Sequence, residues 1–328
     1  MLEAGGLKAI AAGFIGLALS EIDVQSPQPV WVALELSSFQ LADQETIAPD
    51  VGVLLNLSPD HLDRYRDVES YYADKRRLFD SASDASKWVL NADDPACIDL
   101  ASGVAGDRFH FSLRGPVERG AWAGPDGNLR CRLDAEVEWM PTSDLRLLGP
   151  HNVANALAAG LACAVAGVAP EAIAAGLRSF EALPHRLQPI GERDGVLWVN
   201  DSKATNVSAT AVGLRSFDRP VVLILGGRHK GEPYSSLSAD LRHRARAVVA
   251  YGEAAPRIVS DLRGSVDSLS VESGIDAVVG AAAELARPGD VVLLSPACSS
   301  YDMFPNYRER GRAFEAAFRA LPVAGGVS

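Results

Sequence analysis

The sequence predicts an α/β protein of two domains with mostly parallel sheets. Its 328 residues suffice for about two domains, and 48% of them are hydrophobic, which is enough for sizeable cores. Strand-like hydrophobic runs alternate with helical patterns, an order typical of parallel sheets covered by helices on both faces. A helical pattern over 170–180 ends shortly before Leu183-Pro184, where a new series of strands begins. We therefore expect one α/β domain over 1–183 and a doubly wound α/β domain over 184–328.

Each expected element follows from the local pattern. In the first domain we expect strands at 30–36, 51–57 and 88–90, and helices at 70–79 and 152–166. The polar, glycine-rich interval 113–143 predicts antiparallel strands. In the second domain we expect buried strands at 196–199, 221–225, 247–251 and 291–294. The mildly hydrophobic segment 10–19 is far shorter than the roughly 20 residues of a membrane span and lacks signal-peptide features, so a half-buried helix or strand is expected.

Composition argues against several classes of protein. The formal net charge of -11 is unfavourable for nucleic acid as a partner, because nucleic-acid binding favours a basic face. A phosphorylated substrate stays open, since local arginine and lysine side chains can dominate a pocket. The four cysteines lie far apart and form no C-x-x-C pair. A disulfide framework and a zinc site are therefore not expected, and we expect a cytoplasmic protein without membrane insertion.

The densest polar cluster is the segment Asn200–Asn206, N-D-S-K-A-T-N, which follows the hydrophobic run 196–199. It brings together carboxamides, a carboxylate, an amine and hydroxyls. Such groups are costly to bury without partners, and open α/β sheets bind ligands beyond the carboxyl ends of their strands. The segment therefore predicts the lip of a ligand site.

Ionisable side chains also follow two strands of the first domain. Glu35 interrupts the end of the run 30–36, where it either pairs with an arginine or a helix N-terminus or acts as a metal ligand or base, and the sequence leaves both open. His61 lies in the cluster 58–63, and neutral imidazole is a common metal ligand, although Ser or Asp side chains there can also cap a helix. Residues 75–77, Lys-Arg-Arg, lie on an amphipathic pattern that by itself predicts a solvated face.

Three further segments carry candidate binding groups. Asn152 fits an N-cap of the alanine-rich helix, and Asn155, one turn further, fits a contact with a planar base; the two interpretations are compatible. In Gly226–Gly231 the paired glycines permit close approach of a ligand, and Lys230 supplies positive charge, which favours an anion site. Cys298 follows the last strand, where burial as a small residue is expected rather than catalysis.

Together and in this order, these motifs resemble those of the Mur ligase family. Single motifs are weak evidence, but seven in family order are strong. The segments that carry the resemblance span almost the whole chain: 35–41, 60–65 with Lys75, 149–155, 183–186, 200–206, 226–231 and 295–307. The segment Asp201–Asn206 favours the branch that adds D-glutamate to UDP-N-acetylmuramoyl-L-alanine in peptidoglycan synthesis.

The resemblance implies an acid–amino-acid ligase that uses ATP and Mg²⁺. Such enzymes phosphorylate a substrate carboxylate with ATP, and the amino group of the incoming amino acid attacks the acyl phosphate. By the resemblance, Glu35 binds one magnesium ion, His61 binds a second, and Lys75 is carbamylated, which gives it the anionic oxygens that magnesium prefers. UDP-N-acetylmuramoyl-L-alanine and glutamate are the implied partners, and a monomer is expected.

The resemblance also implies where the nucleotide and the amino acid bind. Asn152 and Asn155 would lie near adenine, and Arg186 and Asp201 would contact the ribose or the phosphates. The incoming glutamate would be held by cations and hydroxyls: Lys203, Thr205, Lys230, Ser300 and Tyr307. Lys203 and Lys230 match an anionic substrate best on charge grounds. Lys203, which would also contact the acyl phosphate, joins His61 and Lys75 as an expected catalytic residue.

The sequence departs from the family pattern in two places. The family has a first domain that binds the uridine nucleotide, followed by a phosphate-binding loop of the type G-x-x-G-K-[ST]. No such loop occurs in the 328 residues, and Met1–Gly6 is expected to lie just past its position. Phe14 stands where the family usually has an asparagine that touches the muramoyl substrate. Two alternatives stay open: a family member that binds without ATP chemistry, and a related ligase for another amino acid. A polypeptide of these residues alone is expected to have little ligase activity.

Overall fold

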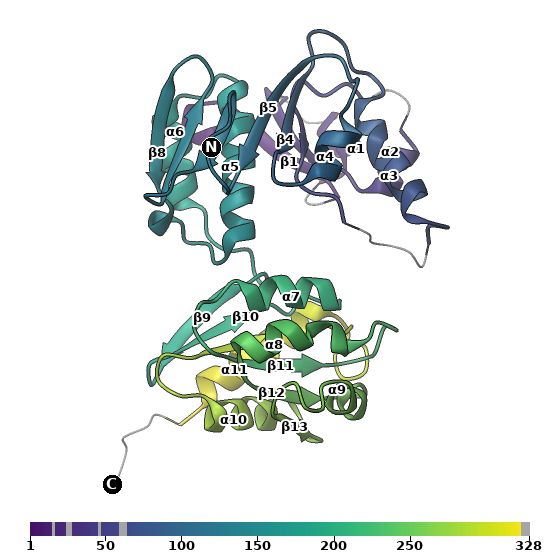
Figure 1. Cartoon of the computed structure of the whole chain (residues 1–328), viewed down its shortest axis with the longest axis vertical. Helices are drawn as coiled ribbons and strands as arrows, with labels where there is room; N and C mark the ends of the chain where they lie inside the picture. The colour runs from purple at the N-terminus through teal and green to yellow at the C-terminus, as the bar shows by residue number, and fades with distance from the viewer. Residues whose placement is uncertain (15–16, 24–27, 45–46, 59–63, 323–328) are drawn as a thin grey trace. The chain divides into compact units, whose positions relative to one another are not determined.

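The computed structural model of the chain describes all residues except 15–16, 24–27, 45–46, 59–63 and 323–328. They form two compact units (Figure 1). Unit 1 comprises Met1–Arg146 and Asn152–Phe180, and unit 2 comprises Leu147–His151 and Glu181–Ser328. The sequence places Leu147–His151 in the first domain, but these residues belong to unit 2 because Leu148 packs against its hydrophobic core.

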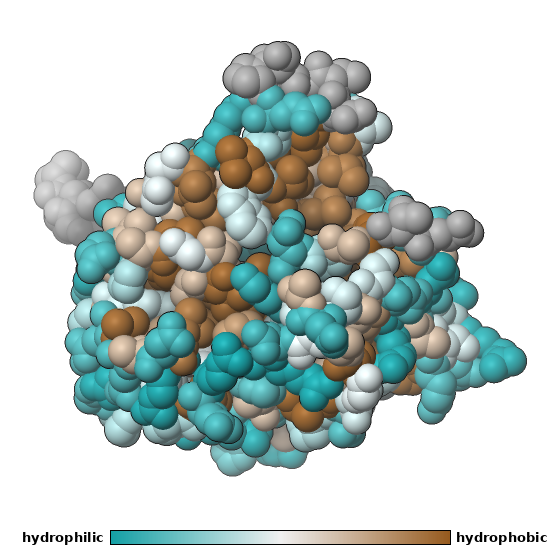
Figure 2. Space-filling view, turned by 90° about the horizontal axis from the view of Figure 1, so that it is seen from above, coloured by the Kyte–Doolittle hydropathy of each residue, from teal (hydrophilic) through white to brown (hydrophobic). Residues whose placement is uncertain are grey.

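Unit 1 begins with a small parallel sheet in which β1 (Ala9–Gly13) pairs with β2 (Trp31–Glu35). The short elements next to these strands in the sequence are η1 (Glu3–Gly5), α1 (Leu19–Asp23) and α2 (Ser38–Ala42). Segment 10–19 therefore contains most of strand β1 and the start of α1. Phe14 is 65% exposed and Val30 is 70% exposed. Figure 2 shows that hydrophobic side chains gather on the face seen from above.

The main sheet of unit 1 has the strand order β3-β4-β5-β6-β7-β8. Its strands are β3 (Gly52–Leu54), β4 (Lys87–Asn91), β5 (Asp107–Ser112), β6 (Gly120–Ala123), β7 (Asn128–Arg132) and β8 (Glu136–Pro141). They run parallel from β3 to β6 and antiparallel from β6 to β8, which confirms the antiparallel strands expected over 113–143. Strand β5 is not among the strands expected above, although Phe109 and Phe111 alternate with Arg108 and His110 in the period of two that is typical of a half-buried strand.

The helical segments of unit 1 start and pack for local reasons. They are α3 (Val68–Arg76), η2 (Arg77–Phe79), α4 (Pro95–Leu100), η3 (Thr142–Asp144), α5 (Pro150–Val165) and α6 (Pro170–Ser179). Helix α3 starts where the carboxylate of Asp67 accepts a hydrogen bond from the Ser70 backbone N–H at 2.8 Å. Helix α5 packs closely because the ring of Trp139 lies where a Cβ of Gly160 would be.

Unit 2 is a doubly wound fold with the strand order β13-β12-β11-β14-β10-β9. Its strands are β9 (Gln188–Arg193), β10 (Val196–Asn200), β11 (Val221–Gly226), β12 (Ala245–Tyr251), β13 (Ser268–Val271) and β14 (Val291–Leu294). Only the pairing of β9 with β10 is antiparallel among these strands. The chain steps from β10 over the position of β14 to β11, runs outward to β13 and returns to β14. The carboxyl ends of β10, β11 and β14 therefore surround a topological switch point.

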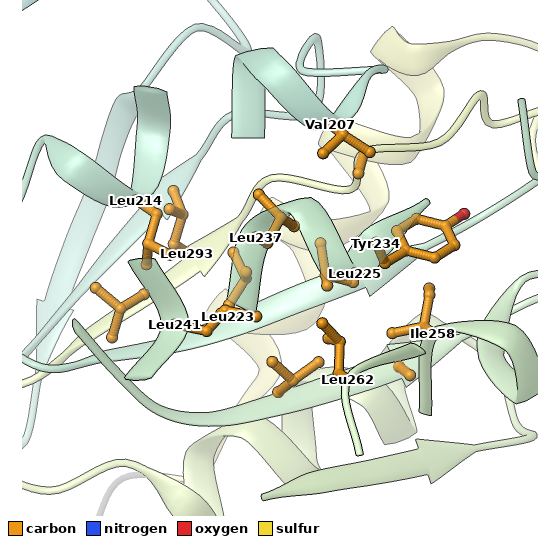
Figure 3. Packing of buried hydrophobic residues seen from close by; sticks show 14 of the residues in the cluster. Val207, Leu214, Leu223, Leu225, Tyr234, Leu237, Leu241, Ile258, Leu262 and Leu293 are labelled. Atoms are coloured by element: carbon orange, nitrogen blue, oxygen red, sulfur yellow. The ribbon is translucent and has the colours of Figure 1, made fainter. Parts of the chain in front are cut away.

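Helices cover both faces of this sheet. They are α7 (Val207–Arg215), η4 (Tyr234–Leu237), α8 (Ser238–Arg244), α9 (Ala255–Asp261), α10 (Ile275–Leu285) and α11 (Tyr307–Ala320). On one face, Leu214, Leu241 and Ile258 pack on Leu223 and Leu225 of β11 (Figure 3). On the other face, α10 and α11 pack on the alternate β11 side chains. Among the described residues no helix is both long enough and hydrophobic enough to cross a membrane.

Candidate active site

Three loops meet at the carboxyl edge of the unit 2 sheet. They follow β10, β11 and β14, which are neighbours because β14 pairs with both other strands. The loops are residues 201–206, 227–233 and 295–306. The structure thereby brings together the segments that carry Lys203, Lys230 and Ser300, which lie far apart in the sequence.

A buried arginine ties the three loops together. Arg310 of α11 is fully buried, and its Nε donates to the Ser202 hydroxyl at 3.0 Å while its Nη2 donates to the Ser202 carbonyl at 2.8 Å. Its Nη1 donates to the carbonyl oxygens of Cys298 at 3.1 Å and Gly226 at 3.4 Å. One guanidinium thus holds the backbone at the ends of β10, β11 and β14.

Sequence reasoning missed Arg310, although a signal for it exists. The buried side of α11 includes Arg310, Phe314 and Ala317, at the i, i+4 and i+7 spacing of a helix face that packs on a core. An arginine in such a stripe must bury its charge, and it therefore requires several acceptors. The pattern alone could have identified Arg310 as a structural cation, but not its acceptors.

The glycine pair after β11 permits close contact between two of the loops. Gly227 has φ of 127°, and a Cβ there would collide with the carbonyl oxygen of Ser299. The Arg228 N–H donates to this same carbonyl at 2.9 Å. In this structure it is the loop after β14, rather than a ligand, that approaches the glycine pair closely. Lys230, further along the same segment, is exposed.

Lys203 and Tyr307 lie next to each other, and both contact His185. The Lys203 backbone N–H donates to the His185 carbonyl at 3.1 Å, and the Lys203 ammonium lies 5.7 Å from the centre of the Tyr307 ring. The His185 ring meets the Tyr307 ring edge to face, with centres 6.0 Å apart. The Ser202 hydroxyl donates to the Tyr307 carbonyl at 2.8 Å, which fixes the start of α11 against the loop after β10.

The hydroxyl residues differ in exposure. Thr205 is half-buried, whereas Ser300 is 3% exposed. The Ser300 carbonyl accepts hydrogen bonds from the backbone N–H groups of Met303 at 3.1 Å and Phe304 at 2.8 Å, so Ser300 starts a tight turn. Only a small part of Ser300 is therefore open to a ligand in this conformation.

Asp201 is a buried carboxyl group with partners inside unit 2. It accepts hydrogen bonds from the Leu187 backbone N–H at 3.1 Å and from the Ser295 hydroxyl at 2.9 Å. Burial raises its pKa to about 7, although these hydrogen bonds and the charge of Arg186 act in the opposite direction. Arg186 itself is exposed. The predicted contact of both residues with a nucleotide stays a prediction.

Asp201→Asn is expected to remove a pH-dependent contribution of Asp201 to the free energy of unfolding. The folded state holds the proton up to a pKa of about 7, whereas an unfolded aspartate releases it near its ordinary value of 3.8. The stability of the wild type relative to the variant should therefore be highest below about pH 4 and should fall as the pH rises towards 7. Urea unfolding of both chains across this range measures the difference. Asp218→Asn, at an exposed position of unit 2, controls for the lost charge. A difference independent of pH would contradict the prediction.

Cys298 is a buried thiol in a hydrogen-bonded chain. The Tyr234 hydroxyl lies 2.9 Å from Cys298 Sγ and 3.0 Å from His229 Nδ1. Burial raises the pKa of the Cys298 thiol to about 11, so almost no thiolate forms at neutral pH. These features fit the expected role as a small buried residue.

The predicted metal ligands of unit 1 are only partly described. Glu35 ends β2 and is exposed, and its carbonyl accepts a hydrogen bond from the Phe14 N–H at 2.8 Å. His61 lies outside the described residues. Within the described ranges no three His, Cys, Asp or Glu residues form a cluster that could hold a metal ion. A magnesium ion does not require one, because it keeps several waters and binds through one or two carboxylates plus substrate phosphates.

The cations at the end of α3 differ in exposure: Arg76 is exposed, whereas Lys75 and Arg77 are half-buried. The Lys75 ammonium lies 5.2 Å from the centre of the Tyr71 ring. Arg76 donates to the carbonyl of Leu100 at the end of α4. Arg77 donates to the carbonyls of Ala42, at the end of α2, and of Gln44. The solvated-face interpretation therefore fits the exposed Arg76, whereas the half-buried Arg77 is held by the last carbonyl of α2.

Asn152 and Asn155 lie in the first turns of α5. The helix begins at Pro150, so Asn152 is inside its first turn and the N-cap interpretation is wrong. The Asn155 side-chain NH₂ donates to the Asn152 side-chain oxygen at 3.4 Å. Asn155 is exposed and Asn152 is half-buried. Contact with a planar base stays a prediction for both.

Comparison with known proteins places the chain in a family. Residues 15–163 match the Mur ligase middle domain, and residues 185–298 match the Mur ligase glutamate ligase domain. The chain is 39% identical over 321 residues to a UDP-N-acetylmuramoylalanine--D-glutamate ligase of Koribacter versatilis, covering 98% of the chain and 70% of the relative. It is 42% identical over 322 residues to the ligase of the same name from Salinibacter ruber, covering 96% and 70%.

Solved structures agree on the fold. The MurF ligase of Thermotoga maritima in complex with ADP has a TM-score of 0.68 at 18% identity, covering 97% of the chain and 75% of that protein. A murein peptide ligase of Psychrobacter arcticus has a TM-score of 0.59 at 17% identity, covering 98% and 74%. The fold, the two matched domains and relatives of about 40% identity show that the chain belongs to the Mur ligase family.

Proposed function

We propose that the chain forms the middle and C-terminal parts of an ATP-dependent ligase that joins D-glutamate to UDP-N-acetylmuramoyl-L-alanine. The observation that carries the proposal is the carboxyl edge of unit 2, where the loops of Lys203, Lys230 and Ser300 converge in a chain whose curated relatives bear that name. A dicarboxylic amino acid needs cations for its carboxylates, and this edge supplies two lysines and hydroxyl groups.

In unit 2 the lysines have different proposed tasks. Lys203 is half-buried and its backbone is fixed to His185, so its ammonium can stay near the reacting acyl phosphate as charge develops. Lys230 is exposed at the end of a glycine-rich loop and would bind a carboxylate of the incoming amino acid. Thr205, Ser300 and Tyr307 would complete that site.

In unit 1 the proposed roles concern ATP and magnesium. Glu35, exposed at a strand end, presents the hard oxygens that Mg²⁺ binds, and His61 and a carbamylated Lys75 are the further proposed ligands. When bound, magnesium neutralises charge on phosphoryl oxygens. Asn152 and Asn155 would contact adenine, and Arg186 and Asp201 would contact the ribose or the phosphates of the nucleotide. A cytoplasmic location and a monomeric state remain predictions.

The proposed reaction has two steps. The γ-phosphoryl group of ATP is transferred to the carboxylate of the L-alanyl residue, which releases ADP. The neutral amino group of D-glutamate then attacks the acyl carbon, an amide bond forms, and phosphate leaves with the bonding electron pair while the amine loses its proton. Lys203 would hold negative charge on the phosphate in both steps.

An activity assay tests the proposal. The chain is joined to the part of the Salinibacter ruber relative that lies outside the match, about 30% of that protein since the match covers 70%. Phosphate release by this chimera should require ATP, UDP-N-acetylmuramoyl-L-alanine and D-glutamate together. Release with a different amino acid would favour a related ligase. A folded chimera without any turnover would favour a binding protein and contradict the proposal.

A further inference from the structure

The segment 229–232, which carries Lys230, lacks the backbone hydrogen bonds that fix the loop on either side of it. Before this segment, the Arg228 N–H donates to the Ser299 carbonyl at 2.9 Å. After it, η4 begins at Tyr234. Between these points, no backbone N–H or carbonyl of 229–232 forms a hydrogen bond with the residues that the structure describes. The place of Lys230 therefore depends on side-chain contacts of its neighbours.

His229 supplies such a contact. Its Nδ1 lies 3.0 Å from the Tyr234 hydroxyl, which in turn lies 2.9 Å from Cys298 Sγ. The rings of His229 and Tyr234 also meet, with centres 5.5 Å apart and planes inclined by 52°. Tyr234 is 1% exposed and Cys298 is fully buried, and both belong to the hydrophobic core of unit 2. The half-buried His229 side chain thus ties the exposed segment 229–232 to that core.

The hydrogen-bonded chain is complete without a charge and lies close to Lys230. A thiol S–H can donate to the Tyr234 oxygen while the Tyr234 O–H donates to Nδ1 of a neutral His229 ring, so every group in the chain has a partner. Burial raises the pKa of the Cys298 thiol to about 11, and the positive charge of Lys230 is one of the smaller opposing effects. The Lys230 ammonium therefore lies within electrostatic reach of the buried end of the chain.

We infer that His229 is a positioning residue, which fixes the segment 229–232 through its hydrogen bond to Tyr234 and thereby sets the place of Lys230 for the incoming glutamate. The inference rests on the proposed function of Lys230. A lysine ammonium sits on a flexible four-carbon side chain, so holding its backbone lowers the conformational entropy that is lost when it binds a carboxylate. The effect should appear in the binding of glutamate rather than in turnover, because Lys203 is the residue proposed to act on the acyl phosphate.

The test measures the KM for D-glutamate in the chimera. His229→Leu, which removes the hydrogen bond, should raise this KM about fivefold at nearly constant kcat, the effect of one neutral hydrogen bond. Tyr234→Phe keeps the buried ring and should raise the KM by a similar factor. The double variant should show no more than Tyr234→Phe alone, since both substitutions remove the same bond. His229→Gln, whose carboxamide can still bond to the hydroxyl, should recover part of the loss. His243→Leu, at an exposed position of α8, is the matched control and should leave the KM unchanged.

The same substitution in a Lys230→Met background separates positioning from a general structural role. If His229 acts through Lys230, His229→Leu should add no further rise in the KM there. A further rise in that background, or an unchanged KM in His229→Leu alone, would overturn the inference while leaving the proposed function intact. An unchanged KM in Lys230→Met would contradict the role proposed for Lys230 and overturn the inference with it. Failure of the unmodified chimera to use D-glutamate would instead contradict the proposed function.

Discussion

Arg310→Met is expected to destabilise unit 2 strongly. Methionine fills much of the same volume but donates no hydrogen bond, so the Ser202, Cys298 and Gly226 carbonyls would lose their donor inside the protein. An unsatisfied buried polar group costs about 1–3 kcal/mol, and with partial relaxation we expect a total loss of about 3 kcal/mol in the free energy of unfolding. Urea unfolding of the full chain, followed by circular dichroism, measures it.

The neighbouring Arg312 provides the matched control for Arg310. It lies on the same helix but is exposed, and it forms an ion pair with Glu309 at 2.6 Å. Arg312→Met should change the unfolding free energy by less than about 0.5 kcal/mol, as is usual for surface substitutions. Equal effects of the two substitutions would show that Arg310 does not hold the three loops together.

Lys203→Met is expected to abolish most ligase activity of the chimera while leaving the fold intact. Its ammonium is the proposed stabiliser of charge on the acyl phosphate, and removing one such electrostatic group typically lowers the rate about a hundredfold or more. The fold should persist because the backbone N–H of Lys203, which donates to the His185 carbonyl, is kept in the variant. Phosphate release at saturating ATP, with D-glutamate varied, measures kcat and KM separately.

Two variants show whether the Lys203 effect is specific. Lys203→Arg keeps the charge but changes its shape, so it should recover part of the activity. Lys87→Met removes a lysine of unit 1 that donates to the Val165 carbonyl at 3.4 Å and should have a small effect on turnover. Turnover of Lys203→Met close to that of the unmodified chimera would contradict the role proposed for Lys203.

The strands and much of the chemistry of unit 2 could be predicted from the sequence. A short hydrophobic run between a proline and a glycine pair, such as 221–225, is typical of a strand buried on both faces, and β11 spans Val221–Gly226. The convergence of Lys203, Lys230 and Ser300 then follows from parallel pairing, because the carboxyl ends of parallel strands meet at one edge.

Other features depend on tertiary contacts that no local pattern encodes. Strand β5 pairs with β4 and β6, and these pairings bury Phe109 and Phe111 in the core of unit 1. Arg77 fits a solvated face until the end of α2 is known to lie beside it. Asn152 fits an N-cap by residue type alone. The helix begins two residues earlier, at Pro150, because proline is favoured at the first position of a helix.

An NMR titration of the chain with D-glutamate tests the central claim most directly, namely that the carboxyl edge of unit 2 binds the incoming amino acid. We predict saturable shifts of backbone amide signals in the loops 201–206, 226–231 and 298–302, with Lys203→Met weakening the response and L-glutamate producing a smaller one. Saturable shifts confined to other parts of the chain, or none in these loops at millimolar D-glutamate, would contradict the assignment of this edge as the amino-acid site.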